Sequence, residues 1–219
     1  MVVFLTSAIA LGIVFLYGCV GEILTEKAGH LNLGIPGVMS VGAAGGCLGI
    51  SLYMGGLSDT ANANYFLVLL SGVLMSALFS AALGAVYSFL TVSLRCNQNV
   101  TGLAITTFGV GMTMFLMESV IDRTYFAAAS TYITRSLPFA DNLGWFGEIF
   151  LSHGILVYLG IAVALISGWV LNRTRVGLHL RAVGENPAAA DAVGINVTRY
   201  KYIATCVGCA IAGQGGLFY

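Results

Sequence analysis

The sequence predicts an all-α fold that spans a membrane with about six transmembrane helices. Of its 219 residues, 58% are hydrophobic and only 8% are charged, and the mean hydropathy is +0.92. A water-soluble protein has roughly a quarter of its residues charged, and a chain this apolar could not cover its surface with polar groups. The apolar residues also form runs of about 20, the length of helix that crosses a bilayer. We therefore expect one transmembrane domain over residues 1–219.

Six apolar runs, each ended by charged or turn-forming residues, mark the predicted spans. They cover residues 2–21, 31–57, 65–94, 97–117, 151–171 and 202–219. The first run lacks the basic start and cleavage site of a signal peptide, so we interpret it as a spanning helix. The second contains Gly34, Pro36 and Gly37 near its start. Because proline removes a backbone donor, a short or broken helix is expected there.

Glycine residues recur four apart along the second predicted span. Gly42 and Gly46 form one pair, and Gly45 and Gly49 form another. Residues four apart lie on one face of a helix, where glycine lets a second backbone approach closely. This pattern predicts a tightly packed helical bundle.

Lysine and arginine predict the orientation of the chain, since short cytoplasmic loops are rich in them. The loop over residues 172–201 contains Arg173, Arg175, Arg181, Arg199 and Lys201. It is predicted to be cytoplasmic, and Lys27 and Arg95 then lie on the same side. The N-terminus and the loops 58–64 and 118–148, the latter with Arg123 and Arg135, are predicted outside.

The sequence contains none of the HExxH, GxSxG and GxxxxGK[ST] motifs. We therefore expect no catalytic residue and no metal or cofactor bound by this chain. Cys206 and Cys209 have a spacing seen in redox and metal sites, but they lie in an apolar run without a neighbouring acid or histidine. Zero net charge and the lack of a basic stripe argue against nucleic acid as a partner.

Acidic residues are missing from the middle of the predicted spans. Ion-coupled carriers usually place one there, so a secondary transporter is a disfavoured alternative that stays open. An intramembrane enzyme is also disfavoured, because no acid pair, histidine cluster or Ser/Lys dyad lies within the spans.

A short, separately capped helix is predicted inside the cytoplasmic loop. Asn186 is a good N-cap, Pro187 suits the first helical position, and residues 188–193 favour helix. Gly194 suits the position just after the helix. Local physics leaves two interpretations equally open, a plain connector and a docking element.

Four uncharged polar residues lie near the ends or breaks of predicted spans. They are Asn32, Asn97, Gln98 and Thr101. Polar groups in a membrane need partners, and a hydrated path for a solute would supply them. Helix capping and bonds between helices explain each residue equally well.

Three segments resemble one known family. The stretch GLHLRAVGENPAAADAVGINVTRYKY (177–202) resembles the coupling-helix region of bacterial ABC-importer permeases, specifically the nucleoside and simple-sugar group. That group is related to the ribose and branched-chain amino acid permeases. Residues 22–39 and 97–104 resemble two further segments of the same family, in the same order. Pro36 departs from the family pattern, which commonly has Glu at this position.

The resemblance implies a transport subunit without an ATPase site of its own. ATP and Mg would be bound by separate ATPase subunits, into which a coupling helix docks. The residues implied in docking are Gly184, Glu185, Asn186, Pro187, Asp191 and Gly194. Further implied partners are a second permease subunit, identical or different, and an extracytoplasmic solute-binding protein, in a bacterial inner membrane.

The resemblance leaves the solute open. Nucleosides or simple sugars are expected, with branched-chain amino acids as an alternative. The sequence ends within its sixth apolar run, whereas family members continue, so a C-terminally truncated chain is expected.

Overall fold

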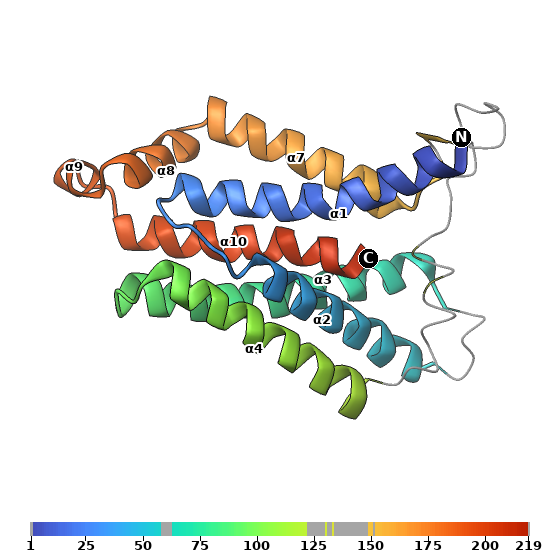
Figure 1. The fold of residues 1–219 in the computed structure, drawn as a ribbon. Coiled ribbons are helices and arrows are strands. Elements are labelled where there is room, and N and C mark those ends of the chain that lie inside the picture. The colour runs from blue at the N-terminus through green and yellow to red at the C-terminus, as the bar shows by residue number, and fades with distance from the viewer. Residues whose placement is uncertain are drawn as a thin grey trace.

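The computed structural model describes residues 2–57, 63–121, 130, 133, 149–150 and 152–218. These residues form a helical bundle in which no strand occurs (Figure 1). The helices are α1 (Val2–Lys27), α2 (Ile35–Gly55), α3 (Tyr65–Ser88), α4 (Gln98–Ser119), α7 (Ile155–Arg173), α8 (Arg175–Glu185), α9 (Pro187–Ala192) and α10 (Val197–Phe218), and a π-helical turn, η2 (Phe89–Ser93), extends α3. The loops expected outside, 58–64 and 118–148, lie largely beyond the described residues.

Five helices in the described part of the chain are long and apolar enough to cross a membrane: α1, α2, α3 with η2, α4 and α7. Each falls at a predicted span. A sixth helix, α10, forms where the last span was expected, but glycine and polar residues dilute its apolar content. It runs through the middle of the bundle, between α1 and the pair α2 and α3 (Figure 1). Its glycines allow this position, because they let neighbouring backbones approach it.

The expected irregularity before α2 is a non-helical entry and not a break within the span. Residues 30–34 are not helical, and α2 then runs unbroken to Gly55. Pro36 lies in the first turn of α2, where its missing N–H removes no helical hydrogen bond. The proline therefore starts this helix and does not kink it.

The glycine pattern of α2 places it directly against α3 and α10. A Cβ added to Gly42 would lie 2.5 Å from Cα of Gly213 in α10 and 2.6 Å from the hydroxyl of Ser80 in α3. A Cβ on Gly49 would lie 2.5 Å from the carbonyl oxygen of Ser71 in α3. The predicted tight packing is confirmed, and it explains why larger residues are absent from these positions.

Large apolar side chains cover the outside of the bundle. Phe15 on α1 and Leu165 on α7 are each 70% exposed, and α3 and α4 carry similar residues. Water would disfavour such a surface, whereas lipid tails would not. The exterior thus fits a bilayer, as the composition predicted.

Candidate functional site

The loop predicted to be cytoplasmic contains two consecutive helices, α8 and α9, at one end of the bundle (Figure 1). The first of them, α8, was not predicted. The hydroxyl of Thr174 caps it by accepting a hydrogen bond from the Gly177 amide at 3.2 Å. On one face of α8, Leu180 and Val183 are buried, and Leu180 packs against Leu24 of α1. This i, i+3 spacing of apolar residues, after a capping threonine, was a signal in the sequence that could have revealed α8.

Both ends of α9 are capped as predicted. The side-chain oxygen of Asn186 accepts a hydrogen bond from the Ala189 amide at 3.0 Å, and Pro187 occupies the first helical position. After the helix, Gly194 has a φ of +86°. The Gly194 amide donates to the Asp191 carbonyl at 2.9 Å and the Ile195 amide donates to the Ala190 carbonyl at 3.0 Å. This pair of bonds is a Schellman motif, which holds a helix end in one geometry.

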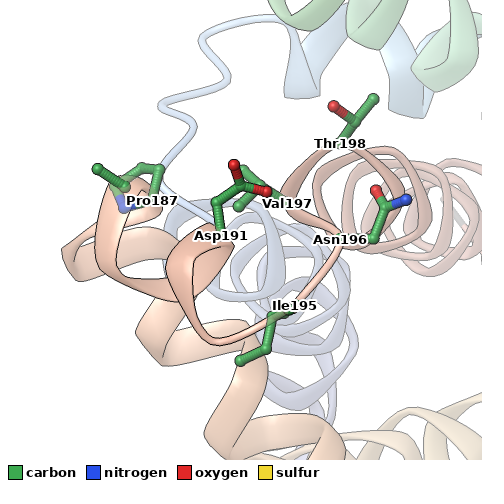
Figure 2. A pocket seen from close by; sticks show the side chains of 8 residues that line it. Pro187, Asp191, Ile195, Asn196, Val197 and Thr198 are labelled. Carbon is green, nitrogen blue, oxygen red and sulfur yellow. The ribbon is translucent and has the colours of Figure 1, made fainter.

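The outer surface of α9 is exposed and bears a groove of about 610 Å³. Figure 2 shows residues that line the groove, among them Pro187 and Asp191 of α9 and Val197 and Thr198 at the start of α10. Glu185 and Asp191 are both exposed here. A short helix with two fixed ends and an open face can contact another protein without first becoming ordered.

Gly184, the sixth residue implied in docking, faces the opposite way. It lies in the last turn of α8, and a Cβ there would overlap the carbonyl oxygen of Lys27 at the end of α1. The predicted docking set therefore divides into an outer surface and one residue that contacts the bundle.

The four polar residues predicted for a path gather where α2 and α4 begin. Asn97 is exposed and caps α4 by accepting hydrogen bonds from the amides of Asn99 and Val100. The Gln98 side chain accepts a bond from the Leu31 amide at 3.0 Å. Asn32 and Thr101 are buried, at 2% and 7% exposure. In the conformation described, Asn97 caps its own helix, whereas Gln98 and Asn32 bond to residues of other segments.

One further polar residue of this junction was missed. Glu22, in α1, accepts a hydrogen bond from the Asn32 amide at 2.8 Å and another from the Thr25 hydroxyl at 3.1 Å. The side-chain amide of Asn32 in turn donates to Sγ of Cys209 in α10 at 3.6 Å. The predicted first span ended at residue 21, so Glu22 was expected outside the helix, whereas α1 continues as far as Lys27.

No group of three or more metal-ligating side chains occurs in the described ranges. Cys206 is half-buried and Cys209 is buried among apolar residues of α2, α3 and α4. At this position Cys209 acts as a small packing residue.

Comparison with known proteins gives a family for this arrangement. Residues 3–219 match the family model described as branched-chain amino acid transport system / permease component. The nucleoside ABC transporter permease protein NupC of Lactococcus lactis is 30% identical over 205 residues, which are 93% of this chain and 62% of NupC. The guanosine ABC transporter permease protein NupQ of Bacillus subtilis is 32% identical over 204 residues, covering 91% of this chain and 61% of NupQ.

A sugar permease also matches over a shorter stretch. The galactose/methyl galactoside import permease protein MglC of Escherichia coli is 34% identical over 122 residues, 55% of this chain and 35% of MglC. The chain spans about three-fifths of the length of the nucleoside and guanosine permeases that it matches.

Proposed function

Because this chain belongs to the branched-chain amino acid transport system / permease component family, we propose that it is the membrane-spanning subunit of an ATP-driven importer for nucleosides or simple sugars. The substrate class follows from relatives named for nucleosides, guanosine and galactose. They favour this class over branched-chain amino acids, although the family carries the latter name.

The observation that carries the proposal is α9. It is short, capped at both ends, exposed on its outer surface and placed at the end of the bundle where three connections between helices lie. A separate ATPase subunit, with ATP and Mg, would dock on this surface through Glu185, Asn186, Pro187, Asp191 and Gly194. A rigid helix transmits the movement of such a subunit to the rest of the bundle, whereas a flexible loop would deform instead.

The distribution of charge supports a cytoplasmic position for α9. Seven basic residues lie near the ends of the long helices or in the segments that join them, on the same side of the bundle as α9: Lys27, Arg95, Arg173, Arg175, Arg181, Arg199 and Lys201. By the positive-inside rule this side faces the cytoplasm, so the N-terminus faces outward across the inner membrane. A solute-binding protein would then deliver the solute at the outer face, and a second permease subunit would complete the path.

Co-purification tests this proposal. The chain is expressed with the ATPase encoded beside it and captured in mild detergent, with and without residues 185–194. We expect the ATPase to be retained by the wild type and lost from the deletion. Phe4→Ser, on the exposed face of α1 at the far end, is the control and should retain it. Retention by the deletion variant, or no retention by the wild type, would refute the proposal.

Uptake then tests the substrate class. Membrane vesicles that contain the complete transporter and its binding protein should accumulate a nucleoside or a simple sugar when ATP is supplied. Uptake driven by an ion gradient without ATP would instead indicate a secondary transporter.

A further inference from the structure

The segment between α1 and α2, residues 28–34, is called here the α1–α2 link. It is one of the places where the α8–α9 unit meets the rest of the bundle, since α8 also packs on α1, α7 and α10. Gly184 in the last turn of α8 lies against this link backbone to backbone: a Cβ on Gly184 would overlap the Lys27 carbonyl oxygen and lie 3.1 Å from the Gly29 amide nitrogen. A Cβ on Gly29 would in turn lie 3.2 Å from Cα of Gly184.

Glycine is required on both sides of this contact, for different reasons. Gly29 has a φ of +81°, a conformation that other residues rarely adopt. Gly184 is an ordinary helical residue, so close approach alone excludes a side chain there. A contact between two backbones has no flexible side chain to absorb a displacement. Movement of α8 must therefore move the link or open a gap.

The link is bonded on its other side to the start of α4 and to α3. The Leu31 amide donates to Oε1 of Gln98 at 3.0 Å, and the Leu31 carbonyl accepts from the hydroxyl of Tyr87 at 2.8 Å. The Leu33 carbonyl accepts from the hydroxyl of Thr106 in α4 at 2.9 Å. These bonds replace the helical bonds that a non-helical segment lacks, and they tie it to two spanning helices.

A second set of contacts ties the link to α1, α4 and α10. Asn32 bonds to Glu22 of α1 and to Cys209 of α10, as described above. Gly102 of α4 approaches the link so closely that its Cβ would lie 2.9 Å from the Leu33 amide nitrogen. The link thus contacts α8 on one side and the helices α1, α3, α4 and α10 on the other, and it continues directly into α2.

We propose that the α1–α2 link transmits movement from the α8–α9 unit to α2, α3, α4 and α10, with Gly29 and Gly184 as the positioning residues of the contact. The inference rests on the proposed function, since it assumes that an ATPase moves α9. Asn32 and Gln98 then contribute to the transport cycle by bonding the link to α10 and α4.

Gly184→Ala in the complete transporter tests this proposal, with Gly168→Ala as the matched control. Gly168 is also a helical glycine, in α7, but nothing lies within 4 Å of a Cβ placed there. Three quantities are measured in proteoliposomes: ATPase capture, ATP hydrolysis, and solute transported per ATP hydrolysed. We expect Gly184→Ala to keep capture and hydrolysis and to lower transport per ATP by about 2- to 30-fold, the range that altered coupling networks show. Gly168→Ala should match the wild type in all three.

The outcomes separate the two proposals. If the wild type captures no ATPase, the proposed function fails. If capture is normal and Gly184→Ala transports as much solute per ATP as the wild type, the transmission through the link is refuted while the proposed function stands. A loss of capture and hydrolysis together with transport would show a structural role only, and would also refute the inference.

Tyr87→Phe keeps the test decisive if Gly184→Ala does not fold. This change removes only the hydroxyl that binds the Leu31 carbonyl and leaves the buried ring in place. It should also lower transport per ATP while capture stays normal, because it loosens the other side of the link. Unchanged transport per ATP in Tyr87→Phe would overturn the proposal independently.

Discussion

Gly194 offers a clean test of whether the geometry of α9 is fixed by backbone conformation. Its φ is +86°, and nothing lies within 4 Å of a Cβ placed on it. Gly194→Ala therefore introduces no clash and changes only the cost of the left-handed conformation, about 1–2 kcal/mol for an alanine. That cost corresponds to a population of the capped helix end that is about 5- to 30-fold lower relative to open forms. A helix of six residues has little other local stability to offset the loss.

Hydrogen–deuterium exchange of the peptide that contains residues 186–195 measures this effect. The amides of Ala190, Gly194 and Ile195 are bonded within the caps of α9, so they should exchange faster in Gly194→Ala by the same factor. Gly194→Asn is the control, because asparagine tolerates the left-handed region, and its exchange should stay near that of the wild type. Equal exchange in Gly194→Ala and the wild type would refute this account of the helix end. If Gly194→Ala and Gly194→Asn both exchanged equally fast, the cost of the left-handed conformation would not be the cause of the faster exchange.

Three further predictions concern the stability of the bundle. Gly42→Val should lower the stability of the protein in detergent by about 1–3 kcal/mol, because the valine side chain would collide with Gly213. Gly111→Val is the control for β-branching in a helix, since nothing lies within 4 Å of a Cβ placed on Gly111. An equal loss of stability in the two variants would contradict the packing argument. Tyr17→Phe should cost about 1 kcal/mol, since the hydroxyl of Tyr17 in α1 donates to the Leu156 carbonyl of α7 at 2.8 Å, and unchanged melting would mean that this bond is not formed. Burial, and secondarily the charge of Lys201, lowers the pKa of His30 to about 4, below its ordinary value of 6.5. The unfolded chain then binds a proton that the folded chain does not, so stability is full above about pH 6.5 and falls as the pH drops towards 4. Melting curves across this range should show the decline in the wild type and a smaller one in His30→Gln, and identical declines would exclude His30 as the source.

Much of the fold was predictable because bilayer thickness and backbone hydrogen bonding leave few choices. Runs of about 20 apolar residues predicted six spanning helices, and the five described helices that are long and apolar enough to span a membrane lie close to five of the predicted places. Asn186, Pro187 and Gly194 predicted the ends of α9, since capping depends on residues within a few positions of one another. The same local signals around Thr174 would have predicted α8.

The family could also be recognised from sequence alone. Residues 22–39, 97–104 and 177–202 carried the resemblance to ABC permeases, and the match over residues 3–219 confirms it. The roles of individual polar residues could not be recognised in this way. Whether Asn32, Gln98 and Thr101 face a solute, cap a helix or bond to a neighbour depends on which helices lie beside them.

What the sequence by itself determined is therefore the membrane environment, the helices, the caps of α9 and the family, because each depends on composition or on residues close together in the chain. Only the tertiary structure decided that α10 runs through the middle of the bundle and that Glu22, Asn32 and Cys209 meet. It also decided that Gly29 touches Gly184, more than 150 positions away in the chain. Such contacts depend on how whole helices pack, and the packing is set by many small complementary surfaces that no local pattern records.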